Sequence, residues 1–295
     1  MGKDLGAAFP AALEVFQAVD DALGVALSKL MWDGPEDELT LTHNAQPAIL
    51  THSLAVWSVV QPALDPVGGA GHSLGEYSAY AAAGALSATD AARLVRRRGE
   101  LMYEAGQARP GTMAAVIGLE AGQVSDACAQ ASAEHDVVVA ANLNAPDQAV
   151  ISGDPEAVER AGKLLKESGA KRVLPLKVSG AFHSPLMEPA AEGLRTELEG
   201  VDFADPAFPV IANASAEPVR DAATARRGLG DQLTAPVRWV ESMQRAVDEA
   251  GADATFVEVG PGAVLSGLLR RIVRDTRSVA LGTADQLNTF MEQHA

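Results

Sequence analysis

The sequence has one cysteine, no long apolar run and few positive charges, and each shortage narrows what the chain can be. Cys128 is the only cysteine among 295 residues. A chain with one cysteine cannot form an internal disulfide, which favours a reducing compartment, so we expect a cytoplasmic protein. No apolar run approaches the roughly 20 residues that cross a bilayer. The opening "MGKDLGAAFP" has no basic region followed by an apolar core, so it does not resemble a secretory signal.

Positive charge is the other scarce property. Lys and Arg number 23 against 39 Asp and Glu, which gives a formal net charge of −16. Nucleic acids and anionic membranes attract a positive surface, so we expect neither as a partner. An acidic protein partner would need a local basic patch. The basic clusters available are Arg96, Arg97, Lys163, Lys166, Lys171, Arg270 and Arg271.

Hydrophobic residues make up 47% of the chain and charged residues 21%, as in globular proteins with a substantial core. Apolar spacing predicts helices at residues 11–24 and 46–60, a short strand before residue 71, and a helix at 90–106. Cys128 lies among alanines in "VSDACAQASA", where we expect a buried structural residue and not a nucleophile.

From Thr112 the pattern of the sequence changes. The predicted strands are 112–119, 136–146, 148–154 and 170–178, and the predicted helices between them are 120–135 and 155–169. This βαββαβ order is typical of a ferredoxin-like unit. Further predicted helices at 187–200 and 236–251, with strands at 208–215 and 254–262, indicate a surrounding α/β core. The unit from residue 112 therefore reads as an insertion in a larger α/β body.

The stretch "GAGHSLGEYSAYAAAGAL", residues 69–86, places Ser73 between Gly71 and Gly75. One interpretation is a glycine-rich turn before a helix. The other is a nucleophile elbow, a tight strand-to-helix turn that exposes the serine hydroxyl. In an elbow the N–H of the next residue, Leu74, faces the attacked carbonyl from a helix N-terminus.

An activated serine needs a base, and His183 is the best placed of the six histidines. It follows a predicted strand in "VSGAFHSPLM", and α/β proteins place functional groups where strands end. The other histidines fit less well. His294 and His135 are expected at the surface, His43 and His52 are expected to be structural, and His72 adjoins the serine and should point elsewhere.

Arg98 lies on the apolar face of the helix predicted at residues 90–106, whereas Arg96 and Arg97 lie off it. An inward arginine needs an anionic partner, because its charge cannot be removed. One interpretation is a structural salt bridge to a buried Asp or Glu. The other is a fork that grips a substrate carboxylate through two hydrogen bonds. The residues alone leave both open.

The segments "GHSLGEYSA", "VRRRGELM", "GTMAAVIGL", "VSGAFHSPLM", "QLTAPVRW" and "VEVGPGAVLSGLLRRI" resemble, in order, those of the malonyl-CoA:acyl-carrier-protein transacylases of fatty acid synthesis. The resemblance implies an α/β-hydrolase-like large subdomain, residues 1–111 and 181–295, with a ferredoxin-like small subdomain, residues 112–180, inserted into it.

The resemblance also implies roles for single residues. Ser73 matches the nucleophile, His183 its general base and Arg98 the ligand of the malonyl carboxylate. The surrounding residues that it implies are Gln232, whose main-chain carbonyl orients the histidine, Leu74, which donates an oxyanion N–H, and Met113 and Phe182, which line the acyl pocket. "GAFH" at residues 180–183 agrees with malonyl selectivity.

The implied substrates are malonyl-CoA and acyl carrier protein. We expect no cofactor, because the coenzyme A thioester is itself the substrate, no metal, and a monomer. A serine hydrolase, a polyketide-pathway acyltransferase and a non-catalytic carrier-binding module are the alternatives. The last arises because the family opens with a strand and a "PGQGSQ" loop that supplies a second oxyanion donor, whereas "MGKDLGAAFP" resembles the segment just after it. This chain is therefore expected to lack that strand and donor and to begin at an internal methionine. Gln46 is our candidate to replace the donor.

Overall fold

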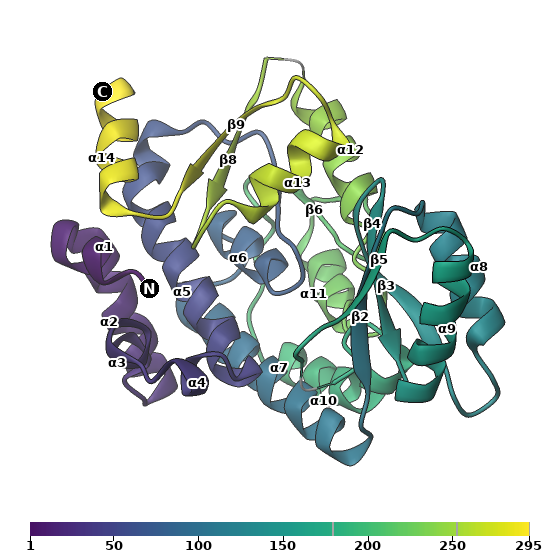
Figure 1. The fold of residues 1–295 in the computed structure, drawn as a ribbon. Helices are drawn as coiled ribbons and strands as arrows, with labels where there is room; N and C mark the ends of the chain where they lie inside the picture. The colour runs from purple at the N-terminus through teal and green to yellow at the C-terminus, as the bar shows by residue number, and fades with distance from the viewer. Residues whose placement is uncertain (179, 252, 295) are drawn as a thin grey trace.

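The computed structural model describes residues 1–178, 180–251 and 253–294, which form a larger and a smaller part (Figure 1). The larger part packs many helices around two small sheets, and the smaller part, at the right of Figure 1, packs two helices on one face of a sheet. The chain enters the smaller part from the larger and returns to it. The exact boundaries at residues 111 and 180 stay a prediction.

The chain opens with helices and reaches its first strand late. The elements are α1 (Lys3–Ala8), α2 (Pro10–Leu23), α3 (Leu27–Asp33), α4 (Glu36–Leu39), α5 (Thr42–Val60), a 3-10 turn (Gln61–Ala63), β1 (Gly69–Ala70), α6 (Gly75–Ala82) and α7 (Ala88–Ala108). The three predicted helices are present. The helix α7 begins at the Ser87 cap, whose hydroxyl accepts the Asp90 N–H. It continues past Gly106, which was expected to end it, because that glycine is not among those with the positive φ typical of a glycine that ends a helix.

The smaller part has the predicted βαββαβ order. Its elements are β2 (Thr112–Ile117), α8 (Ala121–Ala131), β3 (Val138–Ala145), β4 (Gln148–Gly153), α9 (Pro155–Glu167) and β5 (Arg172–Pro175). The sheet order is β3-β4-β2-β5, and all neighbouring strands are antiparallel. The predicted end of the strand at 170–178 is wrong. The strand β5 stops at Pro175, whose nitrogen has no hydrogen to donate to a neighbouring strand.

The rest of the chain completes the larger part. Its elements are a 3-10 turn (Pro185–Met187), α10 (Glu188–Glu199), β6 (Val210–Ile211), β7 (Pro218–Val219), α11 (Ala222–Asp231), α12 (Trp239–Ala250), β8 (Thr255–Val259), α13 (Val264–Ile272), β9 (Arg277–Leu281) and α14 (Ala284–Gln293). The strand expected at 208–215 is much shorter, because the chain turns back after β6 and β7 pairs with it. The Ala212 N–H donates to Glu217 O in this turn.

The strand pairing brings distant segments to one edge of a sheet. The strands β1 and β6 are parallel, with Gly69 opposite Val210, so their carboxyl ends lie side by side. The loop after β1 carries Ser73, and the loop after β6 carries Asn213. The strands β8 and β9 form a separate parallel pair. Functional groups gather at the carboxyl ends of parallel strands, and this edge is where the site lies.

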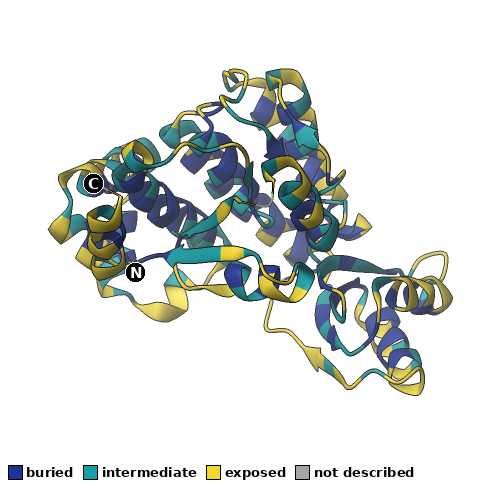
Figure 2. Ribbon diagram, turned by 90° about the horizontal axis from the view of Figure 1, so that it is seen from above, coloured by how far each residue is buried: buried dark blue, intermediate teal, exposed yellow. Residues whose placement is uncertain are grey.

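Each part has its own apolar core, and Figure 2 shows buried residues concentrated inside both. The larger core is centred on α5 and α7, with α2 and α10 packed against them. The smaller core lies between the sheet and helices α8 and α9, and it contains Cys128, as expected for a structural cysteine. In the described parts of the chain, none of the helices combines the length and apolarity that a bilayer crossing needs.

The crossing of α5 and α7 depends on Gly99. A Cβ added there would lie 2.6 Å from His43 Cα and 2.9 Å from Thr42 O, both of them backbone atoms. We expect Gly99→Ala to lower the free energy of unfolding by about 1–3 kcal/mol through overpacking, although alanine favours helices. Gly228→Ala in α11 is the matched control, since a Cβ at that position meets nothing within 4 Å. Thermal denaturation that shows both variants stabilised would contradict this account.

Candidate active site

Ser73 lies on a tight turn between β1 and α6. Its φ is 52°, in the left-handed region that residues with a Cβ rarely adopt. Gly71 is sterically required, because a Cβ there would lie 1.9 Å from Gly75 O. Gly75 is not required for space, since a Cβ at that position meets nothing within 4 Å. The strained serine itself is the mark of a nucleophile elbow.

His183 follows the smaller part in the sequence, and its ring contacts Ser73. Its Nε2 lies 2.8 Å from Ser73 Oγ, and the ring is buried. The opposite nitrogen, Nδ1, lies 3.0 Å from Gln232 O and 3.2 Å from Ala235 O. Carbonyl oxygens only accept, so Nδ1 carries the hydrogen and Nε2 is left free to accept the serine proton. The pairing with Ser73 was expected from the sequence and the Gln232 carbonyl from the family resemblance, whereas the contact with Ala235 O was not expected.

Burial sets the protonation state of His183. Burial, together with the nearby Arg98 charge, lowers the pKa of the imidazole to about 3. The ring is therefore neutral, the form that acts as a base, at any pH well above that value. In the unfolded chain this histidine titrates near its ordinary pKa. The folded state therefore loses stability as the pH falls from about 6.5 toward 3.

A second consequence of this low pKa concerns activity. We expect the second-order rate constant for acylation of Ser73 to change by no more than about twofold between pH 8 and 5.5. This constant reports the protonation state of the free enzyme, in which His183 stays neutral over this range. A histidine with an ordinary pKa would lose about tenfold over this range. Among the described residues, the charged or titratable groups that act on the pKa of this ring are Arg98 and His72. Rapid-quench acylation at each pH is the measurement, and a drop with an apparent pKa near 6.5 would contradict it.

Arg98 projects from α7 into the same space and is 1% exposed. Its Nη2 donates to Ser73 Oγ and to Gln232 Oε1, both at 3.0 Å, and its Nη1 donates to Gln46 Oε1. Within the described residues no carboxylate lies within ion-pair distance of this guanidinium. The structural salt bridge is therefore excluded over these residues. A buried cation that has only neutral oxygens as partners is a ready receptor for an anion.

Gln232 and Leu74 lie where the sequence predicted them. The main-chain carbonyl of Gln232 contacts the histidine, and its side-chain Nε2 donates to Ser73 O at 2.9 Å. Leu74 caps the N-terminus of α6, and its N–H donates to no acceptor among the described residues. A free N–H beside the nucleophile, at a helix N-terminus, suits a developing negative charge on oxygen.

Met113 and Phe182 belong to one apolar cluster, and Phe182 immediately precedes His183 in the chain. Met113 is buried in a small cluster with Ala141 and Val150, and Phe182 packs against it. Gln46 has a different place from the one proposed for it. Its Nε2 donates to Thr42 Oγ1 and Met102 sulfur, and its Oε1 accepts from Arg98. The Gln46 amide therefore holds Arg98 and is not free to stabilise an oxyanion.

Sequence reasoning missed two polar residues of the site. Asn213 Oδ1 accepts the Ser73 N–H at 2.7 Å, and Asn213 Nδ2 donates to Gly71 O at 2.7 Å. Glu76, in the first turn of α6, is 1% exposed and accepts from Asn213 N and Gln232 Nε2. A carboxylate on the buried face of a predicted helix was the signal available for Glu76. Nothing near Asn213 in the sequence pointed to the serine.

The two other residues considered as nucleophile or base do not face the reaction. His72 bonds through Nε2 to Asn144 Oδ1 at 2.8 Å, and its ring centroid lies 5.3 Å from that of Trp239. Burial raises the pKa of the Cys128 thiol to about 12, which keeps it protonated and unreactive.

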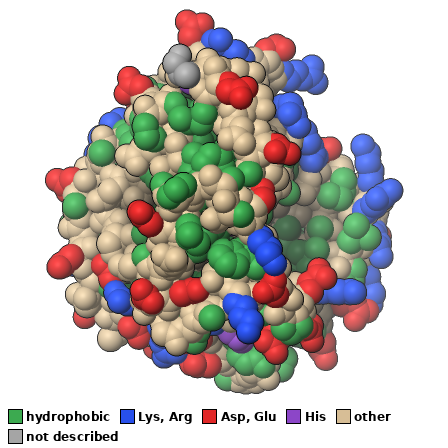
Figure 3. Space-filling model, turned by 90° about the vertical axis from the view of Figure 1, so that its left-hand side faces the viewer, with side chains coloured by type: hydrophobic (Ala, Val, Ile, Leu, Met, Phe, Trp, Pro, Cys, Tyr) green, Lys and Arg blue, Asp and Glu red, His purple; other side chains and the backbone are tan. Residues whose placement is uncertain are grey.

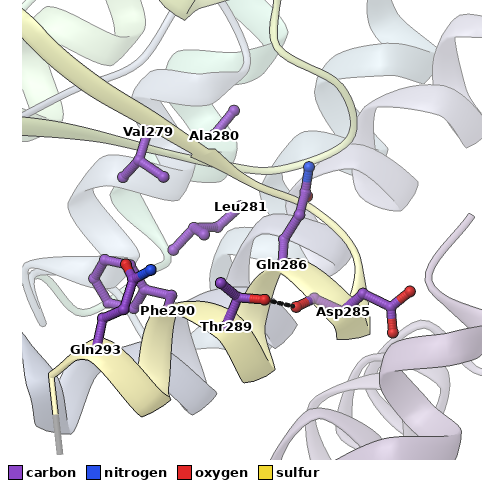
Figure 4. A pocket seen from close by; sticks show the side chains of 8 residues that line it. All are labelled: Val279, Ala280, Leu281, Asp285, Gln286, Thr289, Phe290 and Gln293. Atoms are coloured by element: carbon purple, nitrogen blue, oxygen red, sulfur yellow. Dashed lines mark hydrogen bonds between the residues drawn. The ribbon is translucent and has the colours of Figure 1, made fainter.

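A surface depression of about 270 Å³ lies elsewhere, between β9 and α14 (Figure 4). Its lining comes from those two elements alone, including Leu281, Asp285 and Phe290. None of the elements that carry Ser73, His183 or Arg98 contributes to it. Among the described residues, no group of three His, Cys, Asp or Glu side chains is placed to hold a metal ion.

The family model of the acyl transferase domain matches residues 1–290. The chain belongs to the acyl transferase domain family. Among curated proteins, this acyl transferase domain is 46% identical over 293 residues to the malonyl CoA-acyl carrier protein transacylase of Bacillus subtilis (strain 168). The match covers 99% of this chain and 92% of the relative.

Solved structures match this acyl transferase domain closely. An acyl carrier protein S-malonyltransferase from Vibrio cholerae is 41% identical with a TM-score of 0.93, over 98% of this chain and 94% of that one. A malonyl-transacylase solved in complex with a type II PKS acyl-carrier protein is 42% identical with a TM-score of 0.93, over 99% of this chain and 94% of that one. The predicted α/β fold, with its inserted smaller part, is confirmed.

Proposed function

We propose that this protein transfers a malonyl group from malonyl-CoA to the phosphopantetheine thiol of an acyl carrier protein, through a malonyl ester on Ser73. The observation that carries the proposal is the buried Arg98 guanidinium. It lies 3.0 Å from Ser73 Oγ, and among the described residues it donates hydrogen bonds only to neutral oxygens. The curated and solved relatives are named for malonyl transfer to this carrier, and one of them was solved with such a carrier.

The site residues support a two-step reaction. His183 Nε2 takes the proton from Ser73 Oγ, which attacks the thioester carbonyl, and the Leu74 N–H faces the oxyanion. Collapse breaks the carbon–sulfur bond, and the coenzyme A thiolate leaves with the proton from His183. The carrier thiol then gives its proton to His183 and attacks the malonyl ester. Ser73 leaves and recovers its proton.

Arg98 gives the reaction its acyl selectivity. Two parallel hydrogen bonds from the guanidinium to the malonyl carboxylate would fix the acyl chain with its carbonyl at Ser73 Oγ. Met113 and Phe182 would enclose the apolar part of the chain and limit the access of water. The reaction as written needs neither a cofactor nor a metal. We place it in the cytoplasm, in agreement with the buried, unpaired Cys128, and in fatty acid synthesis.

One experiment separates this function from its alternatives. The protein is mixed with labelled malonyl-CoA, and Ser73 is examined by peptide mass analysis, with Ser73→Ala as the blank. We expect a stable malonyl-Ser73 that discharges when carrier protein is added. Release as free malonate without a carrier would indicate a hydrolase, and no adduct would indicate a non-catalytic carrier-binding module. Faster discharge by a polyketide carrier than by a fatty acid carrier would move the reaction to that pathway.

The edge strand β5 is our proposed docking site for the carrier. Lys171, Arg172 and Lys177 are exposed there beside exposed Leu174. The Leu176 N–H donates to the carbonyl of Met113, a residue proposed to line the acyl pocket. Of the other basic residues, Arg97, Lys163 and Arg271 are ion-paired with the chain's own carboxylates. In Figure 3, Lys and Arg atoms gather along the right-hand side of the molecule, beside a hollow with a hydrophobic floor.

We expect Arg172→Glu with Lys177→Glu to slow transfer to the carrier by about tenfold or more at low salt, because carrier docking would lose its charge attraction. Acylation by malonyl-CoA should stay within about twofold. Lys163→Glu is the control, since Lys163 already pairs with Glu159. The two half-reactions are timed separately at low and high salt. Equal transfer rates for both variants at low salt would count against docking at β5.

A further inference from the structure

Glu76 is a buried carboxylate that the reaction above does not use. It lies three residues after the nucleophile, and its side chain is 1% exposed. One oxygen, Oε2, accepts from Gln232 Nε2 at 2.7 Å and from the Asn213 N–H at 3.0 Å. Burying a carboxylate is costly unless the groups around it gain from its presence. The question is what these two partners gain.

Both partners of Glu76 contact the reacting groups. The main-chain carbonyl of Gln232 receives the His183 Nδ1 hydrogen, and its Nε2 also donates to Ser73 O. Asn213 accepts the Ser73 N–H and donates to Gly71 O, so it braces both sides of the strained turn. A single oxygen atom thus joins the loop after β6 and the end of α11 to the first turn of α6.

Glu76 also fixes which way the Gln232 amide faces. Its Oε2 presents only lone pairs to Gln232 and Asn213, so the amide nitrogen of Gln232 turns toward it. The amide oxygen then faces Arg98, whose Nη2 it accepts at 3.0 Å. With the amide reversed, the NH₂ group would meet the guanidinium as donor against donor. The direction of this amide therefore helps to hold Arg98 next to Ser73.

The contacts point to hydrogen bonding, and not to charge, as the way Glu76 acts. It forms no ion pair within 4 Å of Arg98 in the described chain, and burial raises the pKa of its carboxyl to about 7. Its second oxygen, Oε1, is buried and has no hydrogen-bond partner among the described residues. A proton can therefore reside on Oε1 while Oε2 continues to accept both hydrogen bonds.

We propose that Glu76 is a positioning residue whose Oε2 holds Gln232 and Asn213 so that Ser73, His183 and Arg98 are aligned for acyl transfer. The proposal rests on the proposed function for its effect on malonyl selectivity, which acts through Arg98. Its effect on the reactivity of Ser73 is independent of the acyl substrate. The two effects can therefore be measured separately.

The variants Glu76→Gln and Glu76→Asp distinguish the position of the side-chain oxygen from its charge. Glutamine keeps an oxygen at the position of Oε2 but loses the charge, whereas aspartate keeps the charge but withdraws the oxygen by one methylene. Tyr80→Phe is the control, because Tyr80 lies one turn further along α6 and its buried hydroxyl bonds to no group in the described part of the chain. All three are compared with the unchanged protein by thermal denaturation, so that rates are read only on folded protein.

The first readout is the rate at which a neutral sulfonyl fluoride labels Ser73, which needs the serine and histidine but no malonyl group. We expect Glu76→Asp to slow labelling by about tenfold or more, and Glu76→Gln and Tyr80→Phe to stay within about threefold. The proposal would be overturned if Glu76→Asp were labelled as fast as the unchanged protein, or if Glu76→Gln were labelled more slowly than Glu76→Asp. The latter order would indicate a charge role.

The second readout is the ratio of malonyl to acetyl acylation. We expect this ratio to fall at least threefold in Glu76→Asp and to be kept in Glu76→Gln. If this ratio were unchanged in both Glu76→Asp and Glu76→Gln, the proposed effect of Glu76 on Arg98 would be wrong. If the unchanged protein is labelled by the sulfonyl fluoride but forms no malonyl-Ser73, the proposed function fails, and the labelling series still decides whether Glu76 positions the nucleophile.

Discussion

Replacing His183 by alanine is expected to slow the formation of malonyl-Ser73 at pH 7 by about 10²–10⁴-fold, the usual effect of losing a general base. The imidazole is the only group in the described structure whose free lone pair lies within hydrogen-bond distance of Ser73 Oγ, at 2.8 Å. Arg98, the other side chain bonded to that oxygen, donates and cannot accept the proton. Rapid-quench measurement of the adduct gives the rate.

His135→Ala is the control for this experiment, because that side chain is almost fully exposed in a turn of the smaller part. It should react at the unchanged rate. A His183→Ala variant that acylates as fast as the unchanged protein would show that the base is another group. Ser73→Ala should form no adduct at all, which confirms that the label resides on this serine.

The second large effect is expected at Arg98. Arg98→Ala should slow acylation by malonyl-CoA by about 10²–10⁴-fold, because it removes two hydrogen bonds to a charged group, each worth about 1.5–3 kcal/mol. Acylation by acetyl-CoA should stay within about threefold or increase, because an acetyl group has no carboxylate to place. The measurement is the ratio of the two acylation rates.

Arg97→Ala is the matched control, since Arg97 lies next to Arg98 on α7 but faces outward and pairs with Glu100 and Glu197. Its ratio of malonyl to acetyl acylation should be unchanged. Equal losses for the two substrates in Arg98→Ala would mean that the arginine supports the fold and does not bind the acyl group.

The sequence predicted the parts of the site that come from local pattern. Ser73 was marked by its glycines, Arg98 by its position on an apolar helical stripe, and His183 by its position after a strand. These features depend on a few neighbouring residues, so they can be read along the chain. The order of strands and helices in the smaller part was predicted for the same reason.

The features that were missed depend on contacts between distant segments. Asn213 lies beside Ser73 because β6 pairs with β1, and that pairing spans only Gly69–Ala70 and Val210–Ile211. Strands of two residues leave almost no alternating pattern to detect. Glu76 reads as an ordinary carboxylate in the first turn of a helix until the loops bearing Asn213 and Gln232 close over it.

The backbone at the reacting residues limits how this protein can become more stable. Ser73 and His183 both have positive φ, 52° and 55°, a conformation that costs on the order of 1–3 kcal/mol for a residue with a Cβ. Glycine at either position would relieve that cost but would remove the nucleophile or its base. Selection for thermal tolerance alone would therefore tend to discard the nucleophile or its base. Directed evolution of a hardier variant should hold both positions fixed and seek its gains in the helices away from this edge.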